Sequence, residues 1–103
     1  MQYKSKVCCL IGDPIEHTIS PLIHNIAFQK LGIDYIYVAF RVEKGMLKMA
    51  VDGVRALNIR GLNVTIPHKV EIIKYLDKVD KLAEKIGAVN TVVNEDGKLI
   101  GYN

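Results

Sequence analysis

The stretch Gly61-Leu62-Asn63-Val64-Thr65-Ile66-Pro67-His68-Lys69 decides the fold, because it predicts a short strand that runs directly into a helix. Apolar and polar side chains alternate from Leu62 to Ile66, and a period of two is typical of a strand with one packed face and one polar face. Pro67 removes a donor from the strand ladder and suits the first position of a helix. We therefore expect Leu62, Val64 and Ile66 to pack against a core, and Asn63 and Thr65 to face a cleft.

Strand-like and helix-like segments alternate along the rest of the chain. We expect strands at 7–11, 35–40, 62–66, 88–93 and 98–100, and helices at 21–31, 45–57, 77–86 and from Pro67 onward. The last two strands form a hairpin around the turn at 94–97. This order predicts an α/β fold: an open, mainly parallel sheet with helices on both faces and one antiparallel strand near the C-terminus.

Helical spacing also predicts which side chains enter the core. The expected core residues of the first helix are Leu22, Ile23, Ile26, Ala27 and Leu31, and those of the second are Leu47, Ala50, Val51, Val54 and Leu57. Ser20 and Pro21 are expected as the N-cap and first residue of the first helix. Gly32 and Asn58 are expected to end the two helices.

Length and composition indicate one domain over residues 1–103, with half the residues apolar and a quarter charged. The net charge of +3 comes from scattered side chains, which argues against a nucleic-acid partner. The apolar run that begins at Val7 is far too short for a signal peptide or a membrane span. Cys8 and Cys9 point to opposite faces of a strand and cannot bridge each other, so we expect two buried thiols and a cytoplasmic protein. The histidines lack the spacing of a metal site.

Ligands bind beyond the carboxyl ends of parallel strands, which directs attention to the polar side chains there. Thr18 and Ser20 bring two hydroxyls to the start of a helix, a combination suited to a carboxylate or phosphate. The alternative is that Ser20 only caps its helix. Asn63, Thr65 and Asn90 can donate and accept hydrogen bonds, as a polyhydroxylated ligand requires, although each alone is typical of a turn or strand edge.

Lys69 is the candidate for proton transfer. A helix that begins at Pro67 would place Lys69 in its first turn, where the helix dipole disfavours the ammonium form and so assists exchange of a proton. The alternative is a solvated surface lysine, the commonest fate of this residue type.

Three motifs together resemble one known family. They are Ile11-Gly12-Asp13-Pro14-Ile15-Glu16-His17-Thr18-Ile19-Ser20-Pro21 with His24-Asn25, then Asn63-Val64-Thr65-Ile66-Pro67-His68-Lys69, then Gly87-Ala88-Val89-Asn90-Thr91. Their order and extent are similar to the substrate-binding domain of shikimate dehydrogenase. This resemblance implies an enzyme of aromatic amino-acid biosynthesis that reduces 3-dehydroshikimate to shikimate with NADPH.

The resemblance also implies a role for each candidate residue. Thr18 and Ser20 match the pair that holds the substrate carboxylate, with a threonine where the family usually has a first serine. Thr65 and Asn90 match the residues that bind the ring hydroxyls, and Asn63 is a weaker neighbouring candidate. Lys69 matches the catalytic acid/base, whose ammonium can stabilise or protonate the alkoxide that forms at the C3 oxygen.

Two family features are missing from these residues. The Thr-Asp that follows Gly101-Tyr102-Asn103 in the family supplies the partner of the lysine, and no G-x-G-x-x-G cofactor loop occurs. We therefore expect an inactive fragment with no cofactor-binding residues, whose NADP is bound by a missing C-terminal domain, and self-association through the exposed interdomain face. The alternatives are a quinate or quinate/shikimate dehydrogenase, a stand-alone module that binds small carboxylates, and an interaction domain.

Overall fold

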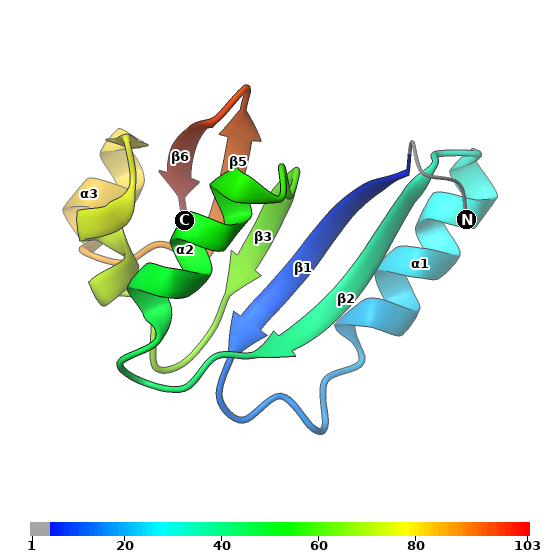
Figure 1. Cartoon of the computed structure of the whole chain (residues 1–103), viewed down its shortest axis with the longest axis horizontal. Helices are drawn as coiled ribbons and strands as arrows, with labels where there is room; N and C mark the ends of the chain where they lie inside the picture. Colours follow the sequence, from blue (N-terminus) through cyan, green and yellow to red (C-terminus); the bar gives the residue numbers. More distant parts are fainter. Residues whose placement is uncertain (1–4) are drawn as a thin grey trace.

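Six strands form one mixed sheet in residues 5–103, the part of the chain that this computed structural model describes (Figure 1). The strands are β1 (Lys6–Gly12), β2 (Tyr35–Arg41), β3 (Gly61–Val64), β4 (Lys78–Val79), β5 (Thr91–Glu95) and β6 (Lys98–Tyr102), in the order β2-β1-β3-β5-β6-β4. β1 pairs in parallel with β2 and β3, and β4 with β6, whereas β5 is antiparallel to both of its neighbours. The predicted fold class, with one antiparallel strand near the C-terminus, is confirmed.

The hydrophobic core lies on one face of the sheet. Cys9 of β1, Leu62 of β3 and Val92 of β5 pack there against α2 (Leu47–Ala56), the 3-10 helix η1 (Glu71–Tyr75) and α3 (Lys81–Ile86). The helices contribute the buried side chains Leu47, Val51, Val54, Ile72 and Ala83. The prediction for α2 is confirmed at Leu47, Val51 and Val54, but Leu57 lies beyond the helix and is exposed.

Helix α1 (Ser20–Leu31) covers the opposite face over β1 and β2. The His24 ring stacks on Tyr37 with 4.2 Å between centroids. The Asn25 side chain donates to the Tyr37 carbonyl at 2.9 Å and accepts from the Tyr37 N–H at 2.8 Å. Because β2 is an edge strand, Asn25 occupies backbone groups that would otherwise be open to a further strand. Helices therefore lie on both faces, and the one over β2 is held by polar and ring contacts.

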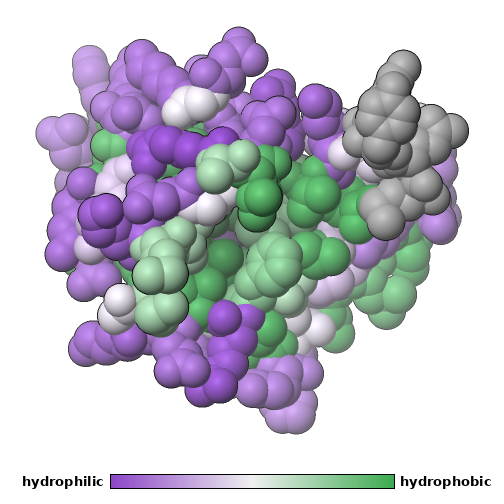
Figure 2. All heavy atoms as spheres, in the orientation of Figure 1, coloured by the Kyte–Doolittle hydropathy of each residue, from purple (hydrophilic) through white to green (hydrophobic). Residues whose placement is uncertain are grey.

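The predicted apolar stripe of α1 is wrong as a core face. None of its residues is fully buried, and Leu22, Ile23 and Leu31 are more than half exposed. The stripe points away from the sheet, which α1 instead meets through His24, Asn25 and Phe28. Hydrophobic residues also gather across the middle of the molecular surface, over β1 and β2 and toward α1 (Figure 2). Phe40 and Leu57 line a hollow of about 760 Å³ on that surface.

The two cysteines are free thiols in adjacent positions of β1. Cys9 is fully buried in the core, and burial raises the pKa of its thiol to about 12. Cys8 faces α1 and is half-buried, so the prediction of two buried thiols holds fully only for Cys9.

The chain after β3 differs from the prediction. The strand ends at Val64, Ile66 is 61% exposed, and turns occupy the residues between Ile66 and Val70 where a helix was expected. The turn is fixed because the His68 N–H donates to the Thr65 carbonyl at 3.0 Å and the buried His68 ring nitrogen Nε2 lies 2.6 Å from the Val42 carbonyl oxygen. Lys69 is therefore not in a first helical turn, and the helix dipole gives no reason for its position.

The predicted helix over 77–86 is replaced by the short strand β4 and by α3. Asp80 ends the strand and caps α3, since its carboxylate accepts the Leu82 N–H at 3.2 Å. The hairpin is confirmed, with its strands shifted to Thr91–Glu95 and Lys98–Tyr102. Gly32 and Asn58 both adopt positive φ after α1 and α2, as their predicted stop positions require.

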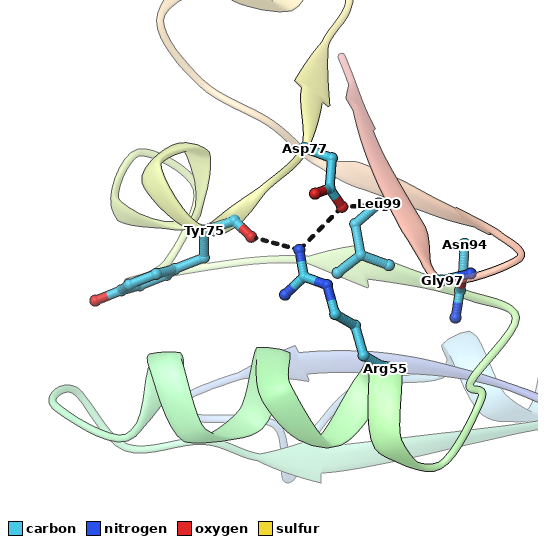
Figure 3. A network of polar contacts seen from close by, with 6 residues as sticks. All are labelled: Arg55, Tyr75, Asp77, Asn94, Gly97 and Leu99. Carbon is cyan, nitrogen blue, oxygen red and sulfur yellow. Dashed lines mark hydrogen bonds and ion pairs between the residues drawn. The ribbon is translucent and has the colours of Figure 1, made fainter.

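Figure 3 shows the polar contacts of Asp77, the residue that precedes β4. The Asp77 carboxylate accepts the Leu99 N–H at 2.7 Å, which aligns the following residues with β6. Arg55 of α2 donates to the same carboxylate and to the Tyr75 carbonyl, each at 3.0 Å. The network therefore joins α2, the end of η1 and β6, three segments that are distant in the sequence.

Stability should depend on the charge of Asp77. The Leu99 N–H first, and then Arg55, lower the pKa of the Asp77 carboxyl. A lowered folded-state pKa means that Asp77 stabilises the fold above its unfolded pKa of about 3.9, and that this stability is lost as the pH falls through the folded-state value. We expect Asp77→Asn to reduce the free energy of unfolding at neutral pH, and the difference from the unmutated chain to shrink as the pH falls below the unfolded pKa of the carboxyl.

Urea denaturation of both proteins across this pH range would check the expectation. Asp52→Asn is the matched control, because the Asp52 carboxylate meets Lys48 in an exposed pair within α2, and such pairs contribute little. A difference between Asp77→Asn and the unmutated chain that stays constant with pH would contradict the role of the charge.

Candidate functional site

The loops after β1 and β3 lie side by side at the carboxyl ends of these two parallel strands, called here the site edge, and are joined by backbone hydrogen bonds. The Thr65 N–H donates to the Ile11 carbonyl at 3.0 Å, and the Asp13 N–H donates to the Ile66 carbonyl at 2.9 Å. Gly12 lies between these bonds, and a Cβ atom placed there would overlap the methyl group of Thr65 and lie 3.0 Å from the Ile66 carbonyl oxygen. The absence of a side chain at Gly12 thus allows Thr65 to occupy this edge.

A hollow of about 300 Å³ opens at this edge and brings three of the predicted site residues together. Thr18, Ser20 and Thr65 all line it, and they come from the loop before α1, the start of α1 and the segment after β3. Its other lining residues are Leu10, Pro14, Ile15, Glu16 and His17. Three hydroxyl groups therefore line one space at the start of α1, which suits a ligand with several hydrogen-bonding oxygens.

The start of α1 corrects the prediction that Ser20 is the N-cap. The helix begins at Ser20 and its N-cap position is Ile19, which makes no side-chain cap bond. The Thr18 hydroxyl oxygen instead accepts the Ser20 N–H at 3.2 Å. Because Ser20 is already inside the helix and not at its N-cap position, the interpretation of Ser20 as only an N-cap is wrong.

Asn90 lies at the same edge, because it directly precedes β5 and β5 runs antiparallel to β3. Its carbonyl accepts the Val64 N–H and its N–H donates to the Tyr102 carbonyl, both at 2.9 Å. The segment before β5 is thus fixed between the end of β3 and the end of β6. The Asn90 side-chain oxygen accepts the Thr91 hydroxyl at 3.0 Å.

Asn63 and Thr65 line different hollows, although the alternation of the strand predicts that they face one cleft. Asn63 belongs to a hollow of about 180 Å³ beside α1, with His24, Tyr37 and Thr91. Its side chain accepts the Tyr37 hydroxyl at 2.7 Å and donates to the Thr91 hydroxyl oxygen at 3.4 Å. The structure therefore places Asn63 beside α1 and Thr65 beside the loop before α1.

Lys69 is exposed in the turn that follows Pro67. Its carbonyl accepts the Val89 N–H at 2.8 Å, which places its backbone next to the residue before Asn90. The prediction that a helix dipole disfavours the ammonium form of Lys69 does not apply in this turn. Lys69 remains a candidate because it lies between the segments that carry Thr65 and Asn90.

An ion pair at the same edge was missed from the sequence. Arg41, at the end of β2, donates to the Asp13 carboxylate at 3.0 Å and lies 3.6 Å from Glu43. Asp13 belongs to the loop that leads toward Thr18, so this pair ties the loop to β2. Thr91 was also missed, although it closes the third motif quoted above.

Within residues 5–103, no group of three or more acidic, histidine or cysteine side chains could hold a metal ion, and no helix is long and apolar enough to cross a membrane.

Comparison with known proteins agrees with this geometry. The model of the family described as the shikimate dehydrogenase substrate binding domain matches residues 10–92. A shikimate dehydrogenase (NADP(+)) of Methanocaldococcus jannaschii is 60% identical over 100 residues, which cover 97% of this chain and 36% of that protein. A crystal structure of shikimate dehydrogenase in complex with NADP+ has a TM-score of 0.97 and 58% identity, and covers 100% of this chain and 36% of its own.

Two further structures bear on the range of ligands in this fold. The shikimate 5-dehydrogenase of Listeria monocytogenes, in complex with shikimate and NAD, has a TM-score of 0.96 and 52% identity over 99% of this chain and 35% of its own. The 5-ketofructose reductase of a Gluconobacter species has a TM-score of 0.96 and 31% identity over 99% of this chain and 37% of its own. The chain thus spans about a third of the length of the proteins it matches. It belongs to the family of shikimate dehydrogenase substrate-binding domains.

Proposed function

We propose that this chain is the substrate-binding part of an NADP-dependent shikimate dehydrogenase, which reduces 3-dehydroshikimate to shikimate. The observation that carries the proposal is the hollow in which Thr18, Ser20 and Thr65 meet. A carboxylate is favourable near the start of α1, because the positive end of the helix dipole lies there and the Thr18 and Ser20 hydroxyls can donate to it. Thr65 and Asn90 would then bind the ring hydroxyls of the same ligand.

Reduction of a ketone requires a hydride at carbon and a proton at oxygen. NADPH would supply the hydride when it is bound, and we propose that another part of the full-length protein binds it, because this chain spans about a third of the length of its NADP(+)-dependent relatives. Lys69 would hold the proton for the oxygen of the carbon that is reduced, and its ammonium would stabilise negative charge there. Asn63 makes its contacts beside α1, so we assign it no direct contact with the ring.

The direct test is an activity assay of the full-length protein that contains this chain. We expect oxidation of NADPH when 3-dehydroshikimate is added, and reduction of NADP+ when shikimate is added. Amide NMR spectra of the isotope-labelled protein should shift near Thr18 and Thr65 on addition of shikimate. No turnover and no shift at these residues would reject the proposal, whereas binding without turnover would favour a module that only binds small carboxylates.

A second candidate substrate is quinate, whose oxidation gives the ketone 3-dehydroquinate, or another polyhydroxylated alcohol, with NAD as the cofactor. It is favoured by the similarity to a 5-ketofructose reductase and to a shikimate dehydrogenase in complex with NAD. Quinate differs from shikimate at the carbon that bears the carboxylate, where it carries one more hydroxyl, so Thr18 and Ser20 would meet the difference. Steady-state rates with each substrate and each cofactor separate the candidates, because the correct pair gives the highest kcat/KM.

The exposed apolar surface supports a further proposal, self-association of this chain when it is isolated. Leu22, Ile23 and Leu31 of α1 and Phe40 of β2 are all exposed, and apolar surface of this kind is commonly covered by another chain or domain. We expect sedimentation of the isolated chain to show dimers or larger species as its concentration rises. Purely monomeric behaviour at high concentration would contradict this.

The free thiols Cys8 and Cys9 favour a reducing compartment such as the cytoplasm.

A further inference from the structure

Four polar side chains form a line of hydrogen bonds on the α1 face of the sheet. The Tyr37 hydroxyl donates to Asn63 Oδ1 at 2.7 Å, Asn63 Nδ2 donates to Thr91 Oγ1 at 3.4 Å, and the Thr91 hydroxyl donates to Asn90 Oδ1 at 3.0 Å. Asn63 and Thr91 are direct partners in the pairing of β3 with β5. The line therefore starts under α1, crosses to the hairpin and ends at a predicted site residue.

Each bond in this line has the same direction. The Tyr37 phenol has a single proton and gives it to the oxygen of the Asn63 amide, which turns the Asn63 nitrogen toward Thr91. The Thr91 oxygen accepts from that nitrogen, so its own proton is available for the oxygen of the Asn90 amide. The orientation of both amides follows from the network. The Asn90 oxygen is thereby occupied, and its NH₂ group is left as the end that can meet a ligand.

Tyr37 is well suited to hold the first position of the line. The residue is 3% exposed, its ring stacks on the His24 ring, and the Asn25 side chain binds both its N–H and its carbonyl group. Burial first, and then the neighbouring Cys9 and Cys8 thiols, raises the pKa of Tyr37 to about 12. The phenol therefore keeps its proton and remains a donor at neutral pH.

We infer that Tyr37, Asn63 and Thr91 are positioning residues that orient the Asn90 amide as a donor toward a ring oxygen of the ligand. This inference rests on the proposed function, because it gives a direction to the contact assigned there to Asn90. In this inference Asn63 acts by orienting the Asn90 amide and does not contact the ligand itself. A bound substrate should consequently meet Asn90 with an oxygen that accepts a hydrogen bond.

Tyr37→Phe in the full-length protein removes only the first donor. We expect the KM for shikimate to rise about fivefold, the effect of one lost or misdirected hydrogen bond, with an unchanged pH profile of kcat. Tyr35→Phe is the matched control: Tyr35 lies two positions away on β2, and its ring packs against Phe28. Thr91→Val should raise the KM as Tyr37→Phe does, and Thr91→Ser, which keeps the hydroxyl, should restore it.

A spectroscopic readout separates positioning from loss of structure. In ¹⁵N-labelled full-length protein, the side-chain NH₂ resonances of Asn90 should shift in Tyr37→Phe, three hydrogen bonds from the change, and stay in place in Tyr35→Phe. Unshifted Asn90 resonances in Tyr37→Phe, or an unchanged KM in Thr91→Val, would overturn the inference. If the unmutated protein does not act on shikimate, the proposed function fails, and the Asn90 resonances still decide whether the line of hydrogen bonds orients this amide.

Discussion

Replacing Lys69 by alanine in the full-length protein is expected to lower kcat for shikimate oxidation by about 10²- to 10⁴-fold, the usual contribution of general acid–base catalysis. The KM should change much less, because the proposed carboxylate and hydroxyl contacts come from Thr18, Ser20, Thr65 and Asn90. Steady-state kinetics with shikimate and NADP+ measure both constants. An unchanged kcat would reject the assigned role of Lys69.

The Lys69 substitution should report on chemistry because it leaves the fold intact. The side chain is exposed, and the bond that holds this turn to the Val89 N–H uses the Lys69 carbonyl, which alanine keeps. Exposed substitutions of this kind change stability by about 0.5 kcal/mol or less. Lys74→Ala is the matched control, since Lys74 is an exposed lysine of η1 that pairs with Glu71 at 3.8 Å. Its kcat should remain that of the unmutated protein.

Replacing Gly12 by alanine is expected to destabilise the chain by about 1–3 kcal/mol, the range for overpacking a close contact. The new Cβ would overlap the Thr65 methyl group and lie 3.0 Å from the Ile66 carbonyl oxygen, so the backbone between the two loops must shift. Thr65 would move with it, and the KM for shikimate should rise as well. Urea denaturation and steady-state kinetics measure the two effects.

Two further variants make the Gly12 prediction specific. Gly53→Ala is the matched control, because no atom lies within 4 Å of a Cβ there and the residue is inside α2. That substitution should stabilise the chain by about 0.5–1 kcal/mol, as replacement of a helical glycine does. Thr65→Ser added to Gly12→Ala removes the methyl group that clashes and should restore part of the lost stability. A double variant no more stable than Gly12→Ala would show that the clash lies elsewhere.

Local patterns predicted what depends on local chemistry. The order of elements, the hairpin and the ends of α1 and α2 followed from alternation, helical spacing and residues that tolerate positive φ, such as Gly32 and Asn58. The same patterns failed where a distant group competes with the local preference. The Leu99 N–H and Arg55 hold Asp77 beside β6, so that the strand β4 follows it, and after Thr65 the buried His68 holds a turn in place of a helix.

The candidate site, too, was predicted only in part from the sequence. Thr18, Ser20, Thr65, Asn90 and Lys69 were proposed from motifs, and their roles stay predictions. The structure brings Thr18, Ser20 and Thr65 to one hollow and places Asn63 in a separate hollow beside α1, where Tyr37 and Thr91 bind its side chain. No local pattern could have indicated that Tyr37, Asn63, Thr91 and Asn90 share a line of hydrogen bonds, since three strands contribute to it.

The sequence by itself determined the family and most of the succession of strands and helices, β4 excepted, because motif spacing and side-chain periodicity are properties of neighbours along the chain. Only the tertiary structure decided the order of the strands, the direction in which α1 turns its apolar residues and the partners of Asn63 and Asp77. These depend on contacts between residues far apart in the chain, where the free energy of a buried hydrogen bond or packed ring exceeds the small preference of a local segment.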